Sequence, residues 1–144
     1  MKFELKNIHI GDCIKRMVNE KEILIHRICN FHKVSEDDIL KMYNQKSLDT
    51  EVLLKWCKLL EYDFFRIYCQ HLILFAPKNK SENTISNIQT SLPQFKKNIY
   101  TKQVVDFILE LINTGQKTKL QIIEEYRIPK TTLYKWISKY NQKE

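Results

Sequence analysis

The residues with the widest chemical repertoire in this sequence are four cysteines and four histidines. Two spacings bring a thiol near imidazole groups: His26-x-x-Cys29-x-x-His32 and His9-x-x-x-Cys13. A structural zinc site needs four converging ligands, and neither spacing supplies them alone. Cys29 falls on an expected apolar helix face, where a thiol packs as a small hydrophobic group. We therefore expect no metal site and no disulfide framework, with a structural zinc as the alternative.

Groups that commonly perform catalysis are not gathered into a known motif. The sequence contains no Gly-rich phosphate loop, no His-Glu-x-x-His and no Gly-x-Ser-x-Gly. Asp106 and Glu110 are one helical turn apart and are most simply a solvated helix edge. Transposase-type catalysis needs several acidic metal ligands on a larger α/β domain, for which this chain has no room. We therefore expect a protein that binds and is not an enzyme, without a cofactor.

The positive charge is concentrated in the last third of the chain. The net charge is +7, from 24 basic and 17 acidic residues. Residues 96–144 carry 10 basic and 5 acidic side chains, whereas residues 1–75 carry 12 and 11. Such an excess favours a polyanionic partner, either nucleic acid or an anionic membrane surface, and a solvated helical surface is the alternative.

The sequence contains no run of 18 apolar residues, so no membrane span is expected. The first residues, Met1 to Lys6, lack the long apolar stretch of a secretory signal. We therefore expect a cytoplasmic protein.

Hydrophobic periodicity predicts an all-α fold of short helices. Ser35 and Thr101 are expected N-caps, and Gly115 is expected just past a helix end. The expected helices cover about residues 10–21, 24–31, 36–43, 50–60, 63–74, 102–113, 118–126 and 130–141.

Changes in composition predict two small helix-turn-helix domains, residues 1–76 and 101–144, joined by a polar linker over residues 77–100. The linker is dominated by Lys, Asn, Ser, Thr and Gln. Its apolar residues are scattered, and the alternative is that they pack onto one of the domains. They are Ile85, Ile88, Leu92 and Phe95.

The last expected helix has the two faces that a groove-reading helix needs. Its inward face carries Leu133, Trp136, Ile137 and Tyr140, spaced i, i+3, i+4 and i+7. The major groove of B-DNA admits one helix, which must present polar or basic side chains outward. The outward side chains expected to contact DNA are Lys130, Thr131, Thr132, Tyr134, Lys135 and Lys139.

Residues 102–141 resemble the small helix-turn-helix of transposases and related regulators. The resemblance rests on the stretch Ile122-Ile123-Glu124-Glu125-Tyr126-Arg127-Ile128-Pro129-Lys130-Thr131-Thr132-Leu133-Tyr134-Lys135-Trp136-Ile137. It implies a domain that places its second helix in the major groove. The alternative is a helical oligomerisation module.

A second set of residues precedes it: Ile10-Gly11, Ile14-Lys15, Glu20-Lys21, Ser35, Ile39, Ser47-Leu48-Asp49-Thr50, Leu53-Leu54 and Tyr62-Asp63-Phe64-Phe65. With them, residues 8–75 resemble the five-helix domain of phage-repressor-like (Xre/Cro-type) regulators. The resemblance implies that the helix over 36–43 reads the groove. It also implies weaker DNA contacts from Ser35, Lys41, Asn44, Gln45 and Lys46.

The repressor-like segment departs from that family where DNA would be read. Leu24 stands where a small polar cap is usual, and the groove-reading helix begins Glu36-Asp37-Asp38, which would repel phosphates. The first domain therefore either binds DNA weakly or serves as a dimerisation or partner-binding module. Surplus apolar residues on the helix over 63–74 favour a homodimer: Phe64, Phe65, Ile67, Tyr68, Leu72 and Ile73.

Taken together, these patterns predict a sequence-specific binder of double-stranded DNA, most simply a transcription regulator. A DNA-binding accessory protein of a mobile element is one alternative. A protein-interaction scaffold that uses the first domain is the other.

Overall fold

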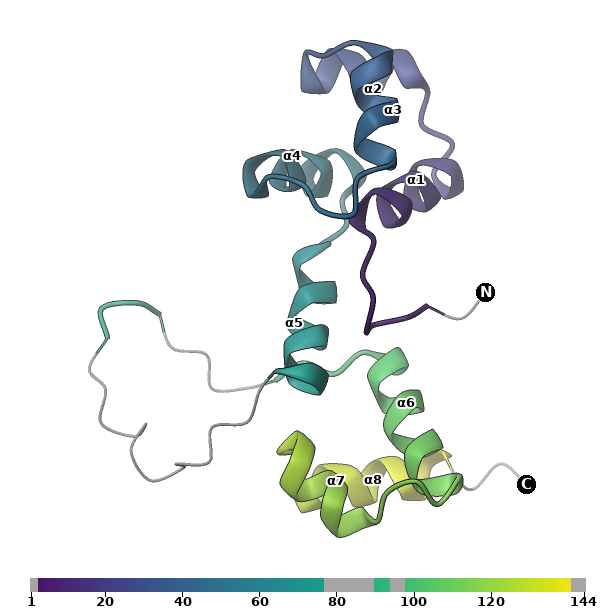
Figure 1. Cartoon of the computed structure of the whole chain (residues 1–144), viewed down its shortest axis with the longest axis vertical. Helices are drawn as coiled ribbons and strands as arrows, with labels where there is room; N and C mark the ends of the chain where they lie inside the picture. The colour runs from purple at the N-terminus through teal and green to yellow at the C-terminus, as the bar shows by residue number, and fades with distance from the viewer. Residues whose placement is uncertain (1–2, 77–89, 94–97, 141–144) are drawn as a thin grey trace. The chain divides into compact units, whose positions relative to one another are not determined.

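A computed structural model describes residues 3–76, 90–93 and 98–140. These residues form eight α-helices and no strand, so the expected all-α fold class is confirmed (Figure 1). The helices are α1 (Ile10–Glu20), α2 (Ile25–His32), α3 (Glu36–Tyr43), α4 (Thr50–Leu60), α5 (Phe65–Phe75), α6 (Lys102–Asn113), α7 (Lys119–Tyr126) and α8 (Lys130–Tyr140).

The chain divides into two compact units, Met1–Cys69 and Gln70–Glu144. The division falls inside α5, whereas the sequence places a boundary after Ala76. The physical reason is that the second half of α5 contributes its buried side chains to the second unit. Gln70 is 2% exposed and Leu74 is 7% exposed, and the Phe75 ring meets the Phe107 ring of α6 with centroids 6.1 Å apart.

The first unit is built by α1 to α4 and the start of α5. Helices α1 and α2 each pack against both α3 and α4, which encloses one apolar core. Its least exposed large side chains come from α1 to α4 and from Phe64 just before α5, and the helical spacing of the sequence predicts most of them. They are Ile10, Ile14, Ile28, Ile39, Trp56, Leu60 and Phe64.

Side-chain caps start several helices where the sequence predicts a cap. Ser35 Oγ accepts the Asp38 N–H, and Thr101 Oγ1 accepts the Val104 N–H. Asp49 likewise accepts the Glu51 N–H. At the end of α6, Gly115 takes a left-handed φ of 70° and donates its N–H to Ile112. These caps satisfy backbone groups that a helix end leaves unpaired, so they set the observed limits.

The second unit places α8 against both α6 and α7. Its core is supplied by Val104, Ile108, Ile122, Ile128 and Leu133, each at most 1% exposed. Thr118 and Gln121 form a reciprocal capping box that starts α7.

The polar segment over 77–100 lies mostly outside the described residues, and so do Ile85, Ile88 and Phe95. Leu92 is described and is 72% exposed. At the far end of the segment, the Gln70 amide donates to the Ile99 carbonyl and accepts the Thr101 N–H at 2.9 Å. Gln70 therefore ties α5 to the residues that lead into α6.

Candidate nucleic-acid interface

Two helix pairs share the same short connection. Helix α2 and helix α7 each have eight residues, and each is followed by a three-residue turn. The first turn residue is left-handed in both cases, with φ 57° at Lys33 and φ 51° at Arg127. The second turn residue is apolar: Val34 is half-buried and Ile128 is 1% exposed. Each unit therefore contains an eight-residue helix, a three-residue turn and a second helix.

Helix α8 presents a polar and basic face to solvent. Five of its six predicted DNA-contacting residues are exposed, and the sixth, Thr132, is half-buried. The sequence from Tyr126 to Lys143 contains no acidic residue. The exposed residues are Lys130, Thr131, Tyr134, Lys135 and Lys139.

The inward face of α8 is narrower than the sequence predicts. Leu133 is fully buried, but Trp136 and Ile137 are half-buried and Tyr140 is 39% exposed. The prediction that Tyr140 is buried is wrong, because burial decreases along α8 towards its last turn. Trp136 packs edge-on against Tyr100, with ring centroids 5.0 Å apart.

The exposed Tyr134 ring is approached by lysines from two helices. The Lys119 ammonium of α7 lies 5.4 Å from the ring centroid, and the Lys130 ammonium of α8 lies 5.8 Å from it. These distances fall within the range of cation–π attraction. The sequence predicts a role for Lys130 and Tyr134 but misses Lys119. The available signal was that Lys119 directly follows an N-cap threonine and so lies at the start of its helix.

One lysine of this unit, Lys117, does not add to such a surface. Lys117 is paired with the Glu125 carboxylate, and this hydrogen bond raises the pKa of the Lys117 ammonium. The Tyr126 ring lies 5.9 Å from the same ammonium. Lys117 is therefore internally neutralised, whereas α8 retains its charge.

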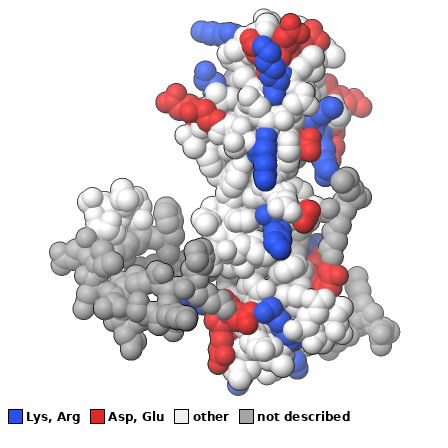
Figure 2. Space-filling model, viewed as in Figure 1, with Lys and Arg blue, Asp and Glu red and all other residues white. Residues whose placement is uncertain are grey.

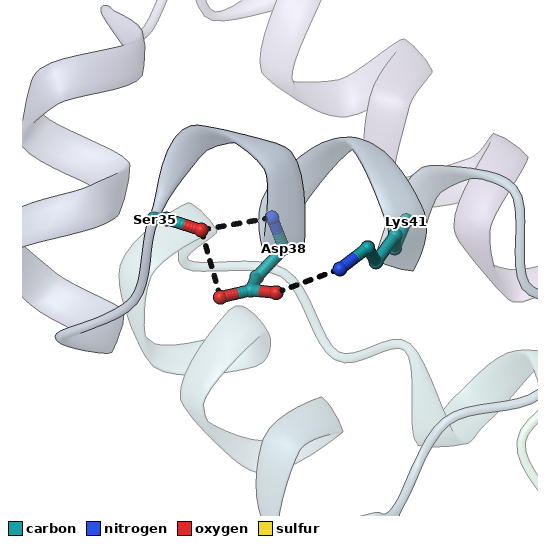
Figure 3. A network of polar contacts seen from close by, with 3 residues as sticks. All are labelled: Ser35, Asp38 and Lys41. Atoms are coloured by element: carbon teal, nitrogen blue, oxygen red, sulfur yellow. Dashed lines mark hydrogen bonds and ion pairs between the residues drawn. The ribbon is translucent and has the colours of Figure 1, made fainter.

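Helix α3 engages two of the side chains predicted to contact DNA. Ser35 Oγ donates to the Asp38 carboxylate at 2.8 Å, and the Lys41 ammonium donates to the other oxygen at 3.3 Å (Figure 3). These hydrogen bonds hold the pKa of the Asp38 carboxyl below its usual range, and the bond from Ser35 has the largest effect. One of the three acidic residues at the start of α3 therefore completes a helix cap and offsets the Lys41 charge.

The other residues of the first unit that are predicted to contact DNA follow the end of α3: Asn44, Gln45 and Lys46. The Asn44 side-chain amide donates back to the Leu40 carbonyl at 3.1 Å. The backbone carbonyls of Gln45 and Lys46 accept the N–H groups of Gly11 and Ile10, both at 3.1 Å, while their side chains are exposed. Their backbone atoms thus hold the start of α1.

The outward stripe of α3 differs from a DNA-reading surface. Glu36, Asp37 and Leu40 are all exposed, and Leu40 is 47% exposed. Their spacing of i, i+1 and i+4 places them on one helical face. A carboxylate pair beside an exposed leucine opposes contact with phosphates.

The histidines and cysteines do not converge. Among the residues that the structure describes, no three His, Cys, Asp or Glu side chains lie close enough to hold a metal ion. His32 instead packs on Trp56, with ring centroids 4.3 Å apart. Within the described helices, none is long and apolar enough to cross a membrane.

Over the face shown in Figure 2, basic and acidic side chains are interspersed. Lysines that gather locally are those of α8 and the start of α7, where Lys119 and Lys130 share the Tyr134 ring. The sequence matches no protein-family model, no curated protein and no solved structure.

Proposed function

We propose that this chain is a sequence-specific DNA-binding protein that acts as a transcription regulator. Helices α7 and α8 serve as its helix-turn-helix, and α8 enters the major groove. The observation that carries the proposal is the acid-free, outward face of α8, with Lys130, Thr131, Tyr134 and Lys135 exposed behind a tight turn. Thr131 and Lys135 reach base edges, while Lys139, farther along the helix, meets a phosphate.

The test begins with selection of bound duplexes from a random pool by the full-length protein. Thr131→Ala and Lys135→Ala are then compared on the selected duplex and on a scrambled one. Loss of a base contact costs about 1–3 kcal/mol on the selected duplex only. Lys139→Ala weakens both duplexes alike, because a phosphate contact carries no sequence information.

Lys58→Ala serves as the matched control, since it removes an exposed lysine from α4 of the first unit. Equal losses on both duplexes from Thr131→Ala and Lys135→Ala would contradict base reading by α8. A full-length protein that selects no duplex would refute the proposed function. A mobile-element accessory role predicts instead that selected sites match element ends.

A second function, binding of a protein partner by the first unit, is favoured by the outward stripe of α3. The proposal is that Glu36, Asp37 and Leu40 face a partner and not DNA. Replacing Glu36→Gln and Asp37→Asn in the full chain should then leave DNA affinity within about twofold. If α3 faces phosphates, removing two repulsive charges should raise affinity by about tenfold or more.

Homodimerisation is part of the proposed DNA-binding function, because two paired groove-reading helices match a two-fold operator. Part of the predicted apolar surplus is accounted for within the first unit, since Phe64 and Ile67 are buried. Leu72 stays 61% exposed. Light scattering of the full chain should show a dimer that Leu72→Glu weakens. A monomer at all concentrations would exclude it.

A further inference from the structure

Tyr134 is the only described aromatic side chain with two lysines over its ring. They come from different helices, Lys119 from the first turn of α7 and Lys130 from the first residue of α8. Because both distances share the ring centroid, the two ammonium groups are separated by no more than the sum of those distances. Tyr134 is 45% exposed, so the cluster is open to solvent.

An aromatic ring positions a cation differently from a carboxylate. The Asp38 and Glu125 carboxylates attract Lys41 and Lys117 but also cancel their charge. The neutral Tyr134 ring attracts an ammonium group through its quadrupole and leaves the full positive charge in place. In the described part of the chain, neither Lys119 nor Lys130 forms an ion pair with a carboxylate. The ring therefore restricts two long side chains without neutralising them.

We propose that Tyr134 is a positioning residue that holds Lys119 and Lys130 as a paired cation site for the phosphates of the DNA backbone. The inference rests on the proposed function and deepens it. The ring reduces the conformational freedom that each lysine would lose on binding. Lys119 joins the interface as a phosphate contact, and Tyr134 acts through the two lysines.

The affinity test uses the full chain and the selected duplex. Tyr134→Leu should weaken binding about four- to twenty-five-fold, since an exposed cation–π contact contributes about two- to fivefold for each of the two lysines. Tyr134→Phe keeps the ring and should stay within about twofold. Lys119→Gln should weaken DNA binding about fivefold when Tyr134 is present. The same change should weaken binding less than about twofold in the Tyr134→Leu background.

Tyr62→Leu is the matched control. Tyr62 is an exposed tyrosine of the first unit, and its ring contacts the Phe64 ring with centroids 4.8 Å apart. This variant should change affinity by less than about twofold. Circular dichroism and thermal unfolding of each variant must match the parent protein, so that a loss of affinity is not a loss of fold.

A second measurement examines the lysines without DNA. Nuclear magnetic resonance of the free protein should show ring-current shifts at the side-chain methylenes of Lys119 and Lys130, lost in Tyr134→Leu and kept in Tyr134→Phe. Absence of these shifts would overturn the inference. The inference would also be overturned if Lys119→Gln weakened DNA binding by the same factor in the parent protein and in the Tyr134→Leu background. Equal losses for Tyr134→Phe and Tyr134→Leu would show that the hydroxyl contacts DNA directly and would also overturn it. If the shifts are present but the parent protein binds no duplex, the proposed function fails and the DNA role of this ring fails with it.

Discussion

His32 and Trp56 are buried side chains whose ring nitrogens lack partners. His32 is 6% exposed and Trp56 is fully buried. In the described part of the chain, Nε2 of His32 and Nε1 of Trp56 form no hydrogen bond. Burial, and secondarily the Lys55 charge, lower the pKa of His32 below 6.5. The folded first unit therefore contains neutral His32, and protonation of this group opposes the fold.

The stability of the first unit should accordingly depend on pH. Because the folded pKa of His32 is depressed, the unfolded chain binds the proton first as pH falls below 6.5. Stability is full above that pH, decreases as pH falls towards the folded pKa, and levels off below it. Denaturant unfolding from pH 7.5 to 5 measures this, and His32→Phe should flatten the slope.

His26→Gln is the matched control, since His26 is an exposed histidine on the same helix. It should leave the pH dependence unchanged. An unchanged slope in His32→Phe would show that other groups control the pH response.

Gly11 allows the start of α1 to meet the end of α3. A Cβ at this position would lie 2.4 Å from the Tyr43 carbonyl oxygen, 2.5 Å from that of Met42 and 2.7 Å from that of Gln45. All three are backbone atoms, which cannot move aside as a flexible side chain can. Gly11→Ala should therefore destabilise the first unit by about 1–3 kcal/mol despite the higher helix propensity of alanine.

Gly115→Ala is the comparison in the second unit, measured by the same thermal unfolding. A Cβ there meets nothing within 4 Å, and only the left-handed φ of 70° is strained. Its cost should be about 1 kcal/mol. A Gly11→Ala variant as stable as the parent would mean that α1 and α3 separate readily.

Helix α5 is the element that changes the expected domain boundary. Its first half supplies Ile67 to the first unit, and its second half supplies Gln70 and Leu74 to the second. A fragment that starts at Thr101 would omit the partner of the Thr101 N–H. Fragments of the second unit should therefore begin before Gln70.

Removing the Gln70 amide should loosen the start of α6. Gln70→Leu leaves the Ile99 carbonyl and the Thr101 N–H without their partner, at about 0.5–1.5 kcal/mol for each lost hydrogen bond. Hydrogen exchange at the Thr101 amide should accelerate in step with the loss of thermal stability. Cys69→Ala, at the exposed neighbouring position, should change neither. Unchanged exchange in Gln70→Leu would contradict the contact.

For the whole chain, the uneven charge distribution predicts where salt acts on DNA binding. Each phosphate neutralised adds about −0.9 to the slope of log affinity against log salt concentration. Changing Lys119, Lys130 and Lys139 together to Gln should flatten the slope of the full chain by up to about three units. The matched triple variant removes Lys15, Lys33 and Lys58, which are exposed lysines of the first unit, and should leave the slope unchanged. A larger effect from the second triple variant would move the electrostatic interface to the first unit.

Helix positions and caps were predictable because they depend on residues close together in the chain. The apolar spacing of Ile10, Ile14 and Val18 and the cap at Ser35 required no knowledge of distant contacts. The exposed face of α8 was predictable for the same reason, since Leu133 fixes which side faces inward.

Contacts between distant residues were not predictable from such local patterns. Gln70 meets Ile99 and Thr101 across 29 and 31 residues, and Lys119 meets Tyr134 from another helix. Tyr140 keeps the apolar spacing of α8 yet is exposed, because periodicity gives a direction and not the extent of the neighbouring core. Helical periodicity constrains each element separately, whereas burial and pairing depend on how the helices pack together.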